Sequence, residues 1–341
     1  MKKLLFYITI CCLLSCGCKR FFSDGLYIKQ EMAMGTFVEI QVFEPEMEAK
    51  TVQYAIENAM DEIKNVSRIM SRFDVKSDIS RVNAEAGRKW VSVNPKTIEV
   101  LNKALRLSEM SNGVYDISVG RILELWGFSG NGQRDIPEKK EIETAMLGVG
   151  FRKVSIDEEN NRVKFKNIYT KIDLGSIAKG YAVDLAARNL KRSGIKNALV
   201  NAGGDIYSMG SNKGRHGWVV GIRHPREKNE IIGTLTIKDK AVVTSGNYEN
   251  FFIKDGKKYS HIIDPGTGYP VENNIVSVTV VSFDTATADG LATMIAISGA
   301  NKGLEIVKAL KDTECIIILE DNNNISFRCS EGLKDIIIPV L

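Results

Sequence analysis

Residues 173–180 have the sequence DLGSIAKG, and this stretch decides what kind of fold the chain can have. An acidic residue, Asp173, is followed by a glycine, and an apolar helical pattern then runs from Ser176 to Ser193. The pattern predicts a strand that ends at the acidic residue, a glycine turn and a helix. Free backbone N–H groups at such a helix start can hold a phosphate, and Lys179 adds a positive charge. The alternative is a plain strand-to-helix turn, since the spacing of a Walker A loop is absent.

Helices and strands are expected to alternate irregularly on both sides of this stretch, according to the periodicity of apolar residues. The expected helices cover residues 46–70, 94–112, 176–193 and 287–297, with a further helix opened by Pro137. The expected strands cover residues 36–43, 198–200, 218–222, 234–237, 241–244 and 276–282, with a hairpin across residues 255–256 and two strands flanking residues 321–324. No repeat or clear linker interrupts the series. The sequence therefore predicts an α+β fold of two interwoven lobes, built from mixed sheets and helices with a cleft between them.

The composition is that of an ordinary globular protein, with 44% hydrophobic and 26% charged residues. The 341 residues are more than one small core usually needs. A formal net charge of +4, without a long Lys/Arg run or the spacing of a zinc finger, argues against a nucleic-acid partner.

The N-terminus has the pattern of an export signal. Lys2 and Lys3 precede a short apolar run at residues 4–14, which is too short to span a bilayer, because a span needs about 20 residues. The run ends Leu-Leu-Ser-Cys at Cys16, which resembles a bacterial lipoprotein signal and implies cleavage before this cysteine and its acylation. Cys18 is the alternative site, and an ordinary secretory signal is the alternative interpretation.

The sequence thus divides into a signal peptide at residues 1–15, a lipidated tether at 16–30 and a main domain at 31–341. We expect the mature protein to be anchored by lipid in the cell inner membrane and to face the periplasm. Cys315 and Cys329 are the cysteines of the main domain, and an exported location leaves open whether they form a disulfide or stay unpaired.

Asp289 and Thr293 form the first candidate for chemistry. They are spaced i, i+4 on an expected helix, so their side chains point the same way. A carboxylate and a hydroxyl are hard oxygen ligands that suit Mg²⁺. The alternative is that Asp289 stabilises the positive helix start and Thr293 is merely buried.

His261 is the second candidate, one of three histidines in the chain. It precedes the turn-rich segment 262–268 at an expected strand end, where a general acid or base could reach a cleft. A structural histidine is the alternative. Nearby in kind is the segment NAGGD at 201–205, whose glycines permit either close approach of a ligand or a tight turn.

Ten short motifs follow one another along most of the chain. They are MGT at 34–36, MSRFD at 70–74, SRVN at 80–83, YDISVG at 115–120, LWGF at 125–128, DLGSIAKG at 173–180, NAGGD at 201–205, TSG at 244–246, HIIDPGTG at 261–268 and ADGLAT at 288–293. In this order they resemble the ApbE family of FAD:protein FMN transferases, over about residues 33–300. Members of that family are often exported lipoproteins.

The resemblance implies that FAD lies in a cleft between two lobes and that its FMN half is transferred to a threonine hydroxyl of a target flavoprotein, with release of AMP. The implied flavin contacts are Met34, Phe73, Tyr115, Asp116, Asp173, Lys179 and Ile262. The implied Mg²⁺ ligands are Asp289, Thr293 and an oxygen of Ser176. His261 would handle the proton near the pyrophosphate.

Two residues depart from the family pattern: Phe73 stands where many members have Tyr, and Gly266 where many have Arg. Three other functions fit the same residues less fully: an FAD pyrophosphatase, a non-catalytic flavin-binding lipoprotein and a structural surface lipoprotein. The expected partners are FAD, the target flavoprotein and the membrane. The oligomeric state stays open, a homodimer included.

Overall fold

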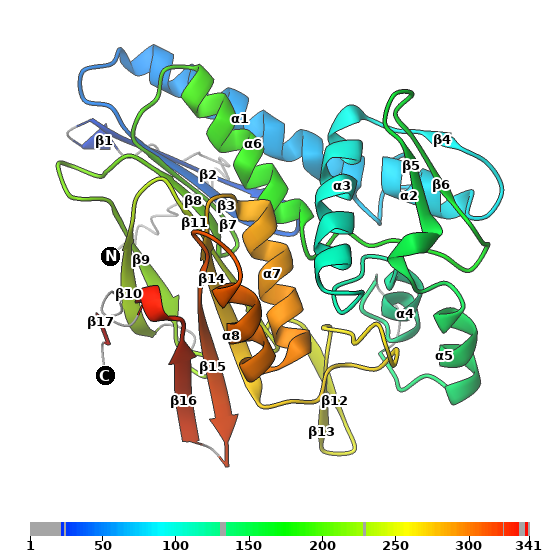
Figure 1. The fold of residues 1–341 in the computed structure, drawn as a ribbon. Helices are drawn as coiled ribbons and strands as arrows, with labels where there is room; N and C mark the ends of the chain where they lie inside the picture. Colours follow the sequence, from blue (N-terminus) through cyan, green and yellow to red (C-terminus); the bar gives the residue numbers. More distant parts are fainter. Residues whose placement is uncertain are drawn as a thin grey trace, which may run out of the picture.

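The computed structural model describes residues 22–23, 25–129, 134–227, 230–322, 324–333 and 338–339 (Figure 1). The expected signal peptide and Cys16 lie outside the described residues. Among the described residues, no helix combines the length and the apolar character that crossing a bilayer requires.

A nine-stranded sheet is the frame of the molecule, and its neighbouring strands are all paired antiparallel. In spatial order its strands are β1 (Phe22–Ser23), β2 (Leu26–Ala33), β3 (Thr36–Phe43), β7 (Ala198–Ala202), β8 (Asp205–Met209), β11 (Ala241–Gly246), β14 (Ile275–Ser282), β15 (Glu314–Asp321) and β16 (Asn324–Cys329). The β-branched strand β14 is buried at every position, because both faces of the sheet are covered there.

Four helices cover one face of this sheet (Figure 1). They are α1 (Ala49–Met70), α6 (Ala178–Arg192), α7 (Thr285–Ser298) and α8 (Ala300–Lys308). The predicted apolar stripe of α1 is confirmed: Val52, Ile56 and Ile63 are buried in the largest core cluster. On the opposite face lies a small sheet of β9 (Trp218–Arg223), β10 (Ile231–Ile237) and β17 (Ile338–Pro339). Its Trp218 packs in a second core cluster with side chains of the large sheet.

The second lobe is formed mainly by the chain between α1 and α6 (Figure 1). Its elements are α2 (Asp78–Ala84), β4 (Val91–Ser92), α3 (Pro95–Met110), α4 (Gly120–Leu125), α5 (Lys139–Met146), β5 (Val154–Asp157) and β6 (Arg162–Phe165). The hairpin of β12 (Phe251–Lys254) and β13 (Lys257–Ser260) joins it from the later sequence. There Trp126 stacks on Tyr259 at 5.5 Å. The prediction of an α+β fold with interwoven lobes is therefore confirmed.

Three sequence-based expectations are wrong in detail. The tether expected to reach residue 30 is shorter, because residues 26–33 pair with β3 as strand β2. β2 has few fully buried positions, so its sequence shows no clear apolar pattern. No strand ends at Asp173; Lys171 makes a single bridge to Val119. Helix α6 begins at Ala178 and not at Ser176, since the extended φ of −153° at Ile177 cannot belong to a helix.

The two cysteines of the main domain are free thiols. Cys315 is buried on β15, and Cys329 on β16 lies opposite the next residue, Ile316. Burial raises the pKa of the Cys315 thiol to about 12, so this thiol stays protonated and unreactive.

Candidate active site

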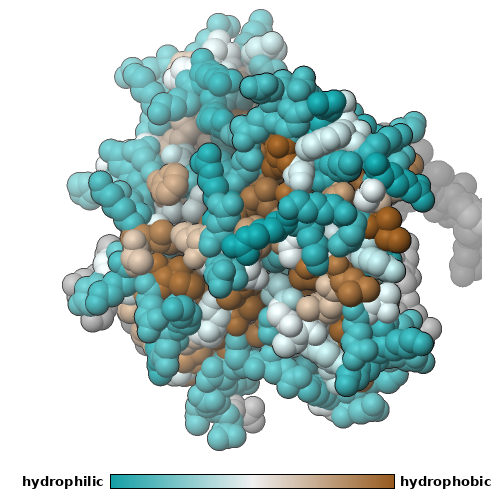
Figure 2. Space-filling view, turned by 45° about the vertical axis from the view of Figure 1, so that its right-hand side comes forward, coloured by the Kyte–Doolittle hydropathy of each residue, from teal (hydrophilic) through white to brown (hydrophobic). Residues whose placement is uncertain are grey.

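A cavity of about 220 Å³ lies where one end of the large sheet meets the second lobe. The sheet contributes Gly203 and residues 244–246, and the second lobe contributes Tyr115 and Phe128. Figure 2 shows this side of the molecule turned forward, with apolar patches interrupting the polar surface.

The cavity brings together most of the residues predicted for the site. Its walls include Tyr115, Asp116, Asp173, Ser176, Lys179, His261, Ile262, Asp289 and Thr293. The structure does not place Met34 or Phe73 on these walls. Met34 occupies the turn between β2 and β3 and packs half-buried against the main core. Phe73 is 65% exposed, with the guanidinium of Arg72 4.9 Å from its ring centre, so neither side chain contacts the cavity in this conformation.

A charged cluster of three residues forms the floor of the cavity. The ammonium of Lys179 lies 2.8 Å from Asp205 and 3.7 Å from Asp289. Both carboxylates are almost completely buried. Burial, and then the charge of Asp289, raise the pKa of Asp205 well above its usual value. Burial alone would lower the pKa of Lys179, but the two carboxylates outweigh it and raise that pKa. Two buried acids thus share one ammonium.

Helix α6 holds α7, which carries Asp289, at very short range. A Cβ atom at Gly180 would lie 2.4 Å from the carbonyl oxygen of Thr285, so only glycine permits this approach. The amide of Gly180 also donates to the Asp289 carboxylate at 3.3 Å. The helix contact therefore fixes where the acidic side chain meets Lys179.

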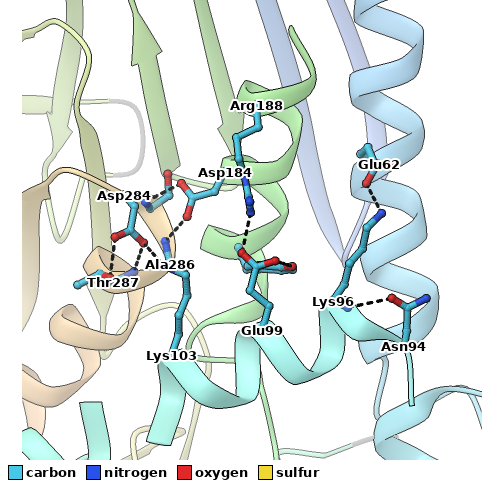
Figure 3. A network of polar contacts seen from close by, with 12 residues as sticks. Glu62, Asn94, Lys96, Glu99, Lys103, Asp184, Arg188, Asp284, Ala286 and Thr287 are labelled. Carbon is cyan, nitrogen blue, oxygen red and sulfur yellow. Dashed lines mark hydrogen bonds and ion pairs between the residues drawn. The ribbon is translucent and has the colours of Figure 1, made fainter. Parts of the chain in front are cut away.

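Asp184, one turn further along α6, grips the start of α7 (Figure 3). Its two carboxylate oxygens accept the amides of Thr285 at 2.7 Å and Ala286 at 3.0 Å. Asp284, the helix's own N-cap, accepts the amide of Thr287 at 2.9 Å. Burial, and then the nearby charge of Asp284, raise the pKa of Asp184. α7 is thus capped twice, once from within its own segment and once from α6.

Tyr115 and Asp116 have different surroundings although they are adjacent. The buried Tyr115 hydroxyl lies 2.9 Å from the Ser176 hydroxyl, which places both on the cavity wall. Both oxygens of Asp116 accept protein N–H or O–H groups: Oδ1 from Ser118 at 2.6 and 2.8 Å, and Oδ2 from the amide of Phe151 at 2.7 Å. Burial raises the pKa of Asp116. In this conformation its carboxylate therefore orders the loop beneath the cavity.

Asp173 forms an ion pair with Arg72, a residue that sequence reasoning left out of the site. The Asp173 carboxylate also accepts the amide of Gly175 at 2.8 Å, which shapes the turn before α6. Arg72 donates to the carbonyl oxygen of Phe128 at 3.0 Å, while its buried Nε has no partner among the described residues. Arg72 thereby joins the end of α1 to both lobes.

His261 is held in one orientation. Its Nδ1 lies 3.0 Å from the carbonyl oxygen of Asn250, so Nδ1 carries the proton and Nε2 is left as an acceptor. Burial lowers the pKa of His261, and the positive charges of Lys179 and Arg72 lower it further. The imidazole is therefore neutral near pH 7 and can accept a proton on the cavity wall.

Comparison with known proteins follows this geometry. The model of the ApbE family matches residues 34–317. The FAD:protein FMN transferase of Vibrio cholerae is 32% identical over 293 residues, which cover 85% of this chain and 86% of that relative. This chain belongs to the ApbE family.

Solved structures of the ApbE family have the same fold. The ApbE protein of Thermotoga maritima has 35% sequence identity and a TM-score of 0.82, covering 91% of this chain and 99% of that one. The flavin transferase ApbE of Vibrio cholerae has 30% identity and a TM-score of 0.81 at the same coverage. These findings confirm the predicted family and fold. The curated relatives are FAD:protein FMN transferases, which confirms the predicted class of enzyme.

Two functional candidates of this ApbE-family site were missed by sequence reasoning. Arg72 and Asp205 both lie inside family-like motifs, but their partners are far away in sequence. Arg72 pairs with a residue 101 positions later, and Asp205 pairs with Lys179, 26 positions earlier. The presence of a charge in each motif was the available signal, and only the fold supplies the pairing.

We predict that Gly180→Ala lowers the free energy of unfolding by about 1–3 kcal/mol, because the new Cβ meets the backbone of α7. Helix propensity alone predicts the opposite sign, a gain of about 1 kcal/mol. Gly290→Ala is the matched control, since its Cβ meets the flexible end of the Leu107 side chain, and it should cost less. Urea denaturation measures both. A Gly180→Ala variant as stable as the wild type would show that the helix contact is not tight.

Proposed function

We propose that this ApbE-family protein is a Mg²⁺-dependent FAD:protein FMN transferase that attaches FMN to a threonine hydroxyl of a target flavoprotein and releases AMP. The observation that carries the proposal is one cavity containing both the buried Asp205–Lys179–Asp289 cluster and a neutral, oriented His261. An anionic pyrophosphate needs the first feature, and a hydroxyl nucleophile needs the second.

The donor atoms in the cavity fit Mg²⁺. They are oxygens: the carboxylates of Asp289 and Asp205 and the hydroxyls of Ser176 and Thr293. The described residues contain no group of three His, Cys, Asp or Glu that would enclose a metal completely. Mg²⁺ typically binds one or two carboxylates and completes its shell with water and substrate phosphates. The charge of two buried acids against one ammonium also favours a dication. We assign Asp289, Thr293 and an oxygen of Ser176 as its ligands.

The bound metal would neutralise charge on the pyrophosphate as it develops. Tyr115 and the buried Ile262 form a wall against which a flat flavin ring can pack. Lys179 and the free amides of the turn at residues 175–177 lie where the phosphates can be held. Asp116 and Asp173 order this wall through their bonds to the loop and to Arg72.

His261 accepts the proton of the acceptor hydroxyl at Nε2. The hydroxyl oxygen then attacks the FMN phosphorus in line, and the bond from that phosphorus to the bridging oxygen breaks. AMP leaves with the bridging oxygen, and FMN remains as a phosphoester on the target. Met34 and Phe73 are retained as flavin contacts only for a conformation in which the loop after α1 lies over the cavity.

We predict that FAD, Mg²⁺ and a candidate target flavoprotein yield AMP together with a target whose mass increases by one FMN. Removing Mg²⁺ with EDTA should stop both products. AMP without any change in target mass would instead make the protein an FAD pyrophosphatase, in which water replaces the hydroxyl. No AMP at all, with FAD still bound, would make it a flavin-binding lipoprotein.

The metal assignment has its own readout. Mg²⁺ should raise the melting temperature of the wild type, because a ligand that binds the folded state stabilises it. Asp289→Ala should remove this shift and raise the Mg²⁺ concentration needed for AMP release. Asp284→Ala is the control, since it lies on the same helix and caps it away from the cavity. An unchanged Mg²⁺ response in Asp289→Ala would exclude this residue as a ligand.

We predict that His261→Ala slows FMN transfer by about 10²- to 10⁴-fold, the usual contribution of a general base. FAD affinity, measured by flavin fluorescence, should change little. Because the pKa of His261 is lowered, the imidazole stays neutral below its usual value of 6.5. Wild-type transfer should therefore fall only as the pH drops below about 6.5, and the variant should lack this limb. A parallel loss of affinity and rate would mean that His261 only positions the pyrophosphate.

The proposed location is the periplasmic face of the inner membrane, through a lipid on Cys16. Its support is the sequence Leu-Leu-Ser-Cys behind a short apolar run. We predict that Cys16→Ala yields an unacylated, unprocessed precursor, as detected by mass spectrometry of membrane fractions. Acylation at the wild-type level would move the anchor to Cys18.

A further inference from the structure

The strands of the large sheet separate the cavity from the place where the chain enters the fold. At the start of β3, the carbonyl oxygen of Phe37 accepts the amide of Gly203, which lines the cavity. At the other end, the amide of Phe43 donates to the carbonyl oxygen of Asn197. The eight residues of β3 span roughly 25 Å, so these two ends of the sheet lie that far apart.

The chain enters the sheet at the end away from the cavity. Leu26, the first residue of β2, pairs with Phe43, and the carbonyl oxygen of Gly25 accepts the amide of Glu44. Nine residue steps separate Gly25 from Cys16, a reach of at most about 30 Å in extended form. A lipid on Cys16 therefore holds this end of the sheet, and not the cavity end, close to the bilayer.

Three loops at the same end are rich in positive charge. They are residues 191–197, 210–217 and 238–240, which we call the basic end. Hydrogen bonds hold the loops together: Ser211 donates to the Asn197 side chain, and Gly210 donates to Asp239, both at 2.9 Å. The cations are Lys191, Arg192, Lys196, Lys213, Arg215, Lys238 and Lys240. Asp239 is the one carboxylate in these three loops.

The cations of the basic end are available to a partner. Six of the seven are exposed and Lys240 is half-exposed. Within the part of the chain that the structure describes, none of them forms an ion pair. The tether adds Lys19 and Arg20, three and four residues after Cys16. The whole chain has a net charge of only +4, so this concentration of charge is local.

We propose that the basic end rests on a bilayer surface of anionic lipid and turns the FAD cavity toward the aqueous space. The proposal relies on the lipid anchor of the proposed function, which brings the loops within reach of the surface. Clustered Lys and Arg beside an anchor are attracted to anionic headgroups within about one Debye length, ~10 Å. The anchor and the basic end together fix the orientation, and the acceptor protein then reaches the cavity from the open side.

The test uses the mature chain, residues 16–341, with Cys16→Ser so that it carries no lipid. It should sediment with vesicles of phosphatidylcholine containing about one-third phosphatidylglycerol, and at least about 10-fold less with pure phosphatidylcholine vesicles. Salt at about 1 M, where the Debye length is about 3 Å, should release it. Replacing Lys196, Lys213 and Arg215 by Gln should weaken vesicle binding by a factor of about 10 or more.

The matched control replaces three exposed lysines of the second lobe, Lys139, Lys140 and Lys166, by Gln. This variant should bind the anionic vesicles within about twofold of the starting protein. Equal weakening by both triple variants would overturn the proposal, since general positive charge and not the basic end would then be responsible. Equal sedimentation with both vesicle types would overturn it as well. Because no acyl chain and no FAD are used, either failure is separate from a failure of acylation or of FMN transfer.

Discussion

The close contact between α6 and α7 is the constraint on which the site depends. α6 offers a glycine where α7 comes nearest, and one turn later it offers a carboxylate to the first amides of α7. The first contact sets the distance between the helices, and the second sets their register. Asp289 follows Thr285 by one helical turn, so fixing the helix start also fixes this carboxylate beside Lys179.

This arrangement gathers more buried negative charge than stability alone would favour. Asp205 and Asp289 share one ammonium, and Asp184 lies near Asp284; in both pairs burial and like charge raise the pKa of one member. A carboxylate with a raised pKa destabilises the folded state as the pH rises past its usual value, because folding then buries a charge. A site that receives a cation gains from such a cost, since the bound ion relieves it. The helix cap has no such relief, and its return is positional.

Periodicity and motif order carried the sequence-based prediction far. The apolar stripe of α1, the strand at 36–43 and the β-branched β14 each follow from local patterns that tertiary contacts reinforce. β2 could not be predicted, because a strand near the sheet edge is only partly buried and needs little alternation. In the site, single residues such as His261 could be named, while the pairing of Arg72 with Asp173 depends on a chain reversal that no local pattern encodes.

The antiparallel pairing of β2 with β3 connects the site to the location of the protein. β2 runs from the tether toward the turn at residues 34–35, and β3 returns, so the chain must enter at the end opposite that turn. The cavity lies at the turn end because Gly203 pairs with Phe37 there. A tether attached at the other end of the hairpin would press the cavity against the lipid and exclude a protein substrate. The direction of one hairpin thus decides whether an anchored transferase of this fold can reach a second protein.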